Sequence, residues 1–181
     1  VNPVRTGYSA IADEWLGVRP GTDGLLILSL VHELLKARRI DVDYLVRYSN
    51  APHLVIDAPA TAEHGLIARD AEGNPLVFET VTERPVAAGT KGARPALHGR
   101  FELGDGRFGV PCFQLLAEKY LDERYAPEAV AASTGIAAET IRALAAEIGR
   151  VAFDEAIVVE QPWTDMHGER HQGYVGRPVS F

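Results

Sequence analysis

Residues 18 to 36 read VRPGTDGLLILSLVHELLK, a proline–glycine turn that leads directly into an apolar run. Thr22 or Asp23 can cap a helix, and no glycine or proline interrupts Leu25–Lys36, so the pattern predicts a helix there. Because Leu, Ile and Val fill almost every position from 25 to 31, we expect this helix to be buried on several sides. The free backbone N–H groups at its start attract anions, and Arg19 adds a positive charge nearby.

Further elements are predicted on the carboxyl side of this helix. Residues from about 50 to 110 carry short apolar runs separated by turn signals, which is typical of β-hairpins and loop. The apolar run Ala156–Glu160 predicts a buried strand, and the residues after Pro162 read as loop. Further helices are predicted over residues 41–48, 111–120, 127–132 and 139–148. Gly135 is expected to end the third of these helices and Gly149 the fourth. One isolated strand cannot close a sheet, so we expect its partner strands to lie outside these 181 residues.

Composition excludes several classes of protein. The chain has 181 residues, a net charge of −7 and 46% hydrophobic residues, which argues against a disordered or collagen-like chain. It carries no block of Lys and Arg, so nucleic acid is not expected as its partner. No apolar run reaches the roughly 18 to 20 residues needed to cross a bilayer, so direct membrane insertion is not expected. A single cysteine, Cys112, excludes intramolecular disulfides and cysteine-based metal clusters within the chain.

The carboxylate of Asp23 has two interpretations from its position alone. Its two oxygens could accept hydrogen bonds from the N1–H and N2–H groups of a guanine base. Alternatively, Asp23 or Thr22 only caps the helix, and spacing by itself favours this capping role. Both interpretations stay open at this point.

The remaining reactive side chains do not form a predicted catalytic or metal site. His32 lies on the apolar helix and is expected to be a satisfied core histidine. His167 and His171 stand four apart, as zinc ligands do on a helix, but Gly168 argues against a helix and no third ligand is evident. Cys112 precedes an amphipathic helix and is expected to be a packing residue rather than a nucleophile.

Several segments in order resemble one enzyme family. Ala12–Leu16 with Val18–Asp23 matches the pattern A-D-x-W-L-x-x-R-P-G-T-D, which is followed by an apolar helix. Asp41–Ala51 resembles D-x-D-F-V-x-x-Y-T-N, and Tyr125–Ile141 resembles Y-T-P-E followed by T-G-I and a helix. This set resembles the molybdopterin oxidoreductases, the dimethyl-sulfoxide-reductase family, over about residues 10 to 50 and 108 to 165. The region 55–108 resembles only a subset of the family.

The resemblance implies a fold and a cofactor. The fold class would be α/β: a helix-rich fragment of a Rossmann-like cofactor-binding domain over residues 1–181, with a β-hairpin and loop insertion at about 52–108. Its cofactor would be molybdenum or tungsten held by two molybdopterin guanine dinucleotides. In the family, the aspartate of R-P-G-T-D recognises guanine, which corresponds to Asp23 here. Around it, Arg19, Pro20, Gly21 and Thr22 would shape the pocket, and Trp163 and Thr164, after the predicted strand, are further cofactor-binding candidates.

The resemblance also implies what the chain would lack. The family's metal ligand and the cysteines of its iron–sulfur cluster would lie before Val1, so we expect an internal fragment of a catalytic subunit that is inactive alone. The whole enzyme would carry out two-electron redox chemistry on a small substrate. A sulfur compound such as sulfite, thiosulfate or polysulfide is favoured, with formate and nitrate open. Its partners would be an iron–sulfur electron-transfer subunit together with a membrane-anchor subunit.

Two points stay open at this stage. A free-standing α/β module that binds a guanine nucleotide, or acts in interactions without catalysis, remains the alternative function. The sequence does not determine the compartment, although the cytoplasm is favoured over the periplasm, with membrane association through a partner. A twin-arginine signal, if the protein has one, would lie before Val1.

Overall fold

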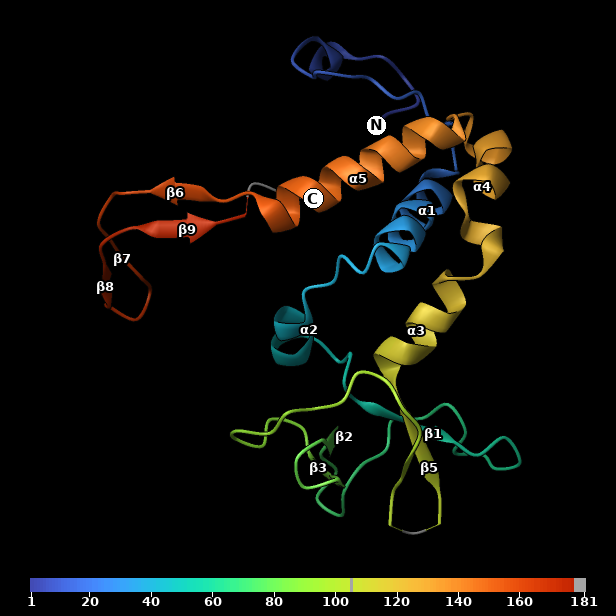
Figure 1. Cartoon of the computed structure of the whole chain (residues 1–181), viewed down its shortest axis with the longest axis vertical. Coiled ribbons are helices and arrows are strands. Elements are labelled where there is room, and N and C mark those ends of the chain that lie inside the picture. The colour runs from blue at the N-terminus through green and yellow to red at the C-terminus, as the bar shows by residue number, and fades with distance from the viewer. Residues whose placement is uncertain (105, 178–181) are drawn as a thin grey trace. The chain divides into compact units, whose positions relative to one another are not determined.

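The computed structural model describes residues 1–104 and 106–177. Its contacts divide the chain into two compact units, one formed by Val1–Ile40 with Tyr120–Phe181 and the other by Asp41–Lys119. Helices are combined with small sheets whose strands pair antiparallel, which is consistent with the predicted α/β class (Figure 1). The predicted insertion, about 52–108, lies within the second unit.

Within the described residues, no helix has both the length and the apolar character that a bilayer crossing requires.

Three helices form the core of the first unit. These are α1 (Asp23–Lys36), α4 (Pro127–Thr134) and α5 (Ala138–Asp154), and α1 contacts both of the others. Short 3-10 helices cover Gly7–Ala10 and Glu123–Tyr125. Apolar residues spaced three or four apart meet between the helices, because that spacing places them on one face. The buried residues of this core are Val18, Leu26, Leu30, Val130, Ile136, Ile141 and Ala145.

The apolar helix is less buried than its composition predicts. α1 begins at Asp23, and its buried residues are Leu26, Ser29, Leu30 and His32. Ile27, in the middle of the apolar run, is 50% exposed. The expectation of burial on several sides was therefore wrong for the described part of the chain, because α1 is covered where it contacts α4, α5 and the Glu123–Tyr125 3-10 helix and is exposed at Ile27.

Two glycines were predicted to end helices, and in the structure only one of them does. Gly135 follows α4 in the left-handed conformation, with φ of 78°, as predicted. Gly149 does not end a helix, since α5 continues to Asp154. A Cβ at position 149 would lie 3.3 Å from Cγ of Arg39, so this glycine permits close packing between α5 and the segment that follows α1. Arg39 is also paired with Asp154 through two hydrogen bonds of 2.7 and 2.8 Å.

The last described segment forms two nested antiparallel hairpins rather than a buried strand and a loop. β6 (Ile157–Val159) pairs with β9 (Tyr174–Gly176), and β7 (Trp163–Thr164) pairs with β8 (Arg170–His171) between them (Figure 1). All three residues of β6 are exposed. The prediction of an isolated, buried strand was wrong, because an apolar run does not reveal which segment pairs with it. The prediction of loop after Pro162 was wrong for β7, β8 and β9.

The second unit is built on short strands. α2 (Val42–Tyr48) opens it, and the side chain of Asp41 caps this helix by accepting a hydrogen bond from the Tyr44 N–H. A three-stranded sheet has the order β1–β5–β4, and a separate hairpin joins β2 to β3. The strands are β1 (Leu54–Asp57), β2 (Leu76–Glu79), β3 (Arg84–Ala87), β4 (Phe101–Glu102) and β5 (Phe108–Pro111).

A small apolar cluster holds these strands together, and a helix follows them. Leu54, Ile56 and Ala68 are buried against a stacked pair of rings, Phe78 and Phe101. α3 (Cys112–Tyr120) follows β5 directly, so Pro111 ends a strand instead of opening the helix as predicted. The hairpins and loops expected between residues 50 and 110 are present in the described residues.

Candidate functional site

A tight turn precedes α1. The Thr22 N–H donates to the Arg19 carbonyl oxygen at 3.1 Å, and Gly21 has φ of 82°. Proline at the second position and a left-handed glycine at the third are typical of a type II turn. The hydroxyl of Thr22 also donates to the Arg19 carbonyl, at 2.7 Å. Pro20, Gly21 and Thr22 therefore have a local structural role that places Asp23 at the first position of the helix.

Arg19 fastens this turn to α4. Its backbone N–H donates to the Thr134 carbonyl at 2.9 Å, and its guanidinium donates to the Ala132 carbonyl at 2.6 Å. A Cβ on Gly135 would lie 3.3 Å from the Arg19 side chain. Arg19 therefore does more than add charge near the helix start, because one of its side-chain donors holds the turn in place.

Asp23 is exposed and makes no hydrogen bond or ion pair with any described residue. The side chain of Thr22 does not cap the helix either, since its hydroxyl donates back to Arg19. Capping by either side chain, the alternative that spacing favoured, is thus not realised in the described structure. The first intrahelical bond joins the Leu26 N–H to the Thr22 carbonyl at 3.1 Å. The three preceding N–H groups have no acceptor among the described residues, so the helix start offers free donors beside a free carboxylate.

Trp163 and Thr164 lie in β7, and both are exposed. The indole of Trp163 stacks on the ring of His171, with 4.5 Å between centroids, and its Nε1–H donates to the Gly173 carbonyl at 3.1 Å. No hydrogen bond or ion pair among the described residues connects these two residues to the turn before α1. The structure does not bring the two groups of predicted cofactor-binding residues together.

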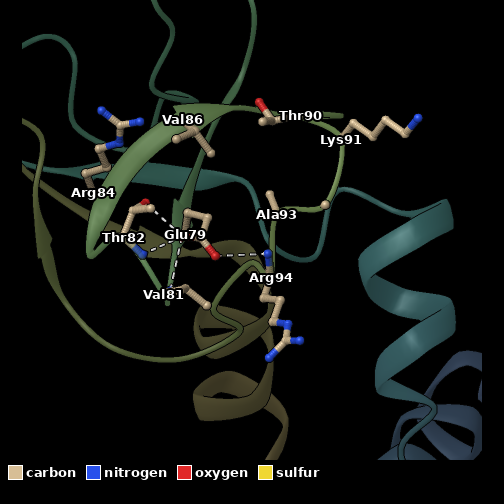
Figure 2. A pocket seen from close by; sticks show the side chains of 10 residues that line it. Glu79, Val81, Thr82, Arg84, Val86, Thr90, Lys91, Ala93 and Arg94 are labelled. Carbon is tan, nitrogen blue, oxygen red and sulfur yellow. Dashed lines mark hydrogen bonds between the residues drawn. The ribbon is translucent and has the colours of Figure 1, made fainter.

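A cavity of about 440 Å³ opens in the second unit beside the β2–β3 hairpin. Glu79 lies in it and is only 6% exposed. Figure 2 shows its carboxylate held by N–H groups of Val81, Thr82 and Arg94, at 3.1, 2.5 and 3.2 Å. The side chains of Arg84, Lys91 and Arg94 point away from it in different directions (Figure 2). The cavity therefore lacks converging cations, and Glu79 acts as an internal anchor for the two surrounding turns.

Lowering the pH is expected to reduce the stability of the second unit, because it protonates Glu79. Hydrogen bonds from the hydroxyl and the N–H of Thr82 lower the pKa of Glu79 from 4.5 to about 2. A depressed pKa means that its stabilising contribution is complete above pH 4.5 and is lost as the pH falls toward 2. We expect Glu79→Gln to lower the melting temperature by several degrees at pH 6 and to have little further effect near pH 2.

Thermal unfolding of the chain and of Glu79→Gln, followed by circular dichroism from pH 6 to pH 2, measures this difference. Glu102→Gln is a suitable control, because Glu102 is an exposed acid in strand β4 of the same unit. Parallel pH profiles for the chain and Glu79→Gln would contradict the anchoring role.

His32 and Cys112 are placed as packing residues. His32 is fully buried, and its Nδ1 lies 2.8 Å from the Tyr120 carbonyl, so it donates there. Its Nε2 has no hydrogen-bond partner among the described residues, so only one of its two ring nitrogens is hydrogen-bonded there. Cys112 is half-buried at the start of α3, and burial raises the pKa of its thiol, which disfavours the nucleophilic thiolate.

The β7–β8 turn brings together a group of side chains that their spacing in the sequence does not predict. Asp165, Glu169 and His171 each place one potential ligand atom within 4.8 Å of the others. A hydrogen bond from His171 lowers the pKa of Asp165. His167, which was paired with His171 by its spacing, is not in the group. The missed signal was an acid on each side of the turn at Gly168, because a hairpin brings together residues that helical spacing does not.

Comparison with curated proteins identifies the class. The relatives are catalytic subunits of molybdopterin oxidoreductases, and the chain belongs to this family of enzymes. It is 46% identical over 191 aligned positions to a sulfite dehydrogenase of Allochromatium vinosum, an alignment that covers 100% of the chain. Over 80% of its length it is 33% identical to the catalytic subunit of a putative dimethyl sulfoxide reductase of Halobacterium salinarum. Over 83% of its length it is 28% identical to the alpha subunit of the dimethylsulfide dehydrogenase of Rhodovulum sulfidophilum.

These relatives are much longer than the chain. The aligned region is 19%, 17% and 18% of their respective lengths. A scan against protein-family models finds no match. Family membership implies a molybdenum cofactor, and because the relatives are named as single subunits, further subunits are implied in their complexes.

Proposed function

We propose that this chain contributes to binding one molybdopterin guanine dinucleotide, with Asp23 recognising the guanine base. The observation that carries the proposal is the uncommitted, exposed carboxylate of Asp23 at the start of α1. Its two oxygens can accept from two N–H groups of guanine, and a charge-assisted pair of this kind is strong and selective. The neighbouring free backbone N–H groups suit the negatively charged or carbonyl groups of a nucleotide.

The residues before Asp23 would fix its position. Arg19 joins the turn to α4 through two hydrogen bonds, and Gly21 supplies the left-handed conformation that the turn needs. Pro20 and Thr22 complete the turn. Trp163 and Thr164 are proposed as additional contacts, and the chain as part of a Rossmann-like domain in which residues from about 52 to 108 form an insertion.

When bound, the cofactor supplies a metal, molybdenum or tungsten, that exchanges two electrons with a substrate. The proposal includes the bis-dinucleotide form and an iron–sulfur cluster elsewhere in the catalytic subunit. This chain's share is to bind and orient the dinucleotide. No catalytic residue or ligand of that metal is assigned to the chain itself.

For the whole protein we propose oxidation of a small sulfur oxoanion, with sulfite as the first candidate. In that reaction, sulfite and water give sulfate, two protons and two electrons. The support is the 46% identity, along the whole chain, to a protein named as a sulfite dehydrogenase. The proposed partners are an iron–sulfur subunit that accepts the electrons, together with a membrane-anchor subunit.

Isolating the native polypeptide that carries this sequence tests the proposal. We expect a mass several times that of 181 residues, bound molybdenum or tungsten, and guanosine monophosphate after acid hydrolysis of the cofactor. Sulfite-dependent reduction of an artificial electron acceptor is the expected activity. A native polypeptide of this size that binds guanosine diphosphate without metal would instead support the guanine-nucleotide module.

A further inference from the structure

The turn between β7 and β8 is organised around one carboxylate. Oδ1 of Asp165 accepts from the N–H groups of His167 and Glu169, both at 2.9 Å. The Asp165 N–H donates to the Glu169 carbonyl at 2.9 Å, and Gly168 adopts φ of 85° at the tip. The first oxygen of Asp165 is therefore committed to the turn, while Oδ2 faces Nε2 of His171 at 3.1 Å.

A second feature orients His171. Its ring stacks on the indole of Trp163, with an interplanar angle of 22°, and the indole is held by its hydrogen bond to the Gly173 carbonyl. This stacking limits rotation of the imidazole and keeps Nε2 directed toward Asp165. Fixing the ring of a histidine ligand by a neighbouring group is a common feature of metal sites.

The ligand set matches a particular class of cation. One imidazole nitrogen and two carboxylate oxygens are ligands that Zn²⁺ and related divalent transition metals accept, whereas Mg²⁺ prefers oxygen alone. Ligands about 2.0 to 2.2 Å from zinc stand roughly 3.4 Å apart in a tetrahedral site. The three ligand atoms already lie within 4.8 Å of one another. Side-chain rotations that move these atoms by about 1 Å would bring them to the tetrahedral spacing.

We propose that the β7–β8 turn binds one divalent transition-metal cation through Asp165, Glu169 and His171, with water in the remaining position. The bound cation joins the two sides of the turn, since Asp165 precedes Gly168 and the other two ligands follow it. It also fixes the hairpin that carries Trp163 and Thr164. This inference depends on the hairpin alone and does not require the cofactor role proposed for Asp23.

Trp163 provides a direct readout, because it stacks on one of the ligands. Trp15 is the other tryptophan of these 181 residues, so comparing Trp163→Phe with Trp15→Phe identifies the part of an emission change that comes from Trp163. The full-length catalytic subunit, without an affinity tag, is titrated with ZnCl₂, and the stoichiometry is measured by calorimetry. We expect a saturable change in Trp163 emission at one Zn²⁺ per chain, a d–d absorption band with CoCl₂, and at least tenfold weaker binding of MgCl₂.

Matched variants identify the ligands. His171→Ala and Glu169→Gln are expected to weaken Zn²⁺ binding at least tenfold. His167→Ala is the control, because this histidine lies in the same turn but outside the group, and it should bind as the parent does. Asp165→Asn keeps an acceptor for the two N–H groups of the turn and removes the charge, so it should weaken binding while the hairpin persists, as judged by the chemical shifts of the Trp163 indole.

The proposal is overturned if Zn²⁺ produces no saturable signal, or if binding is as tight in His171→Ala as in the parent. It is equally overturned if His167→Ala weakens binding as much as His171→Ala does. Each of these outcomes would assign the contact between Asp165 and His171 to stabilisation of the hairpin alone.

Discussion

Replacing Asp23 with alanine is expected to reduce the affinity of the catalytic subunit for its guanine dinucleotide roughly 10- to 100-fold, because a hydrogen-bonded charged partner contributes about 1.5 to 3 kcal/mol. The variant should be isolated with little metal and little guanine nucleotide, measured per polypeptide. Its fold should persist, since the Asp23 side chain makes no hydrogen bond or ion pair with the described residues. The loss of a negative charge from the first turn of α1 is expected to cost at most about 1 kcal/mol.

Two further variants sharpen this test. Asp23→Asn has nearly the same shape but presents an amide N–H₂ to the donor groups of guanine. Its affinity for the guanine dinucleotide should therefore fall nearly as far as that of Asp23→Ala. Glu14→Ala removes another exposed acid that precedes α1 and should leave the cofactor content unchanged. A loss of stability of about 1 kcal/mol in Asp23→Ala with normal metal and nucleotide content would show that Asp23 only supports the helix.

Leu26→Ala is expected to lower the free energy of unfolding of the 181-residue chain by about 2 to 5 kcal/mol, the usual cost of emptying a fully buried leucine site. Leu26 is 1% exposed and belongs to the core formed by α1, α4 and α5. The alanine would leave a cavity between three helices whose other contacts restrict their collapse. Urea denaturation followed by far-ultraviolet circular dichroism measures the change.

Its neighbour in the sequence provides the control. Ile27 is equally apolar but 50% exposed, so Ile27→Ala should cost about 1 kcal/mol or less. Equal losses for the two variants would mean that α1 is covered on both faces, as the apolar run by itself predicts. A large difference confirms that the side of α1 that carries Leu26 is buried and the side that carries Ile27 is not.

The elements that the sequence predicted well are those specified by local chemistry. The turn and helix over residues 19 to 36, the helix predicted over residues 41–48 and the glycine after α4 depend on residues within a few positions of one another. Proline, glycine and capping residues restrict the backbone directly, so their effect can be read from a short segment. The Asp23 hypothesis likewise came from a short pattern, and the structure adds that its carboxylate is uncommitted within the described chain.

Other features depend on which segments meet, and no short segment contains that information. β6 is apolar like a buried strand, but it pairs with β9 and remains exposed. Gly149 resembles a helix end, but the approach of Arg39 explains why a glycine lies within a continuous helix. Glu79 connects two turns because, besides the nearby N–H groups of Val81 and Thr82, the N–H of the distant Arg94 also donates to it.

The sequence by itself determined where the chain turns, where its main helices begin, and which enzyme family it resembles, because these depend on local backbone preferences and on the order of short motifs. Tertiary structure alone decided which face of α1 is buried and which carbonyl groups of α4 accept hydrogen bonds from Arg19. It also decided that the side chains of Asp165 and Glu169 lie beside His171. Those outcomes arise from contacts between residues far apart in the chain or across a hairpin, where packing and hydrogen bonding select among pairings that local preferences leave equally open.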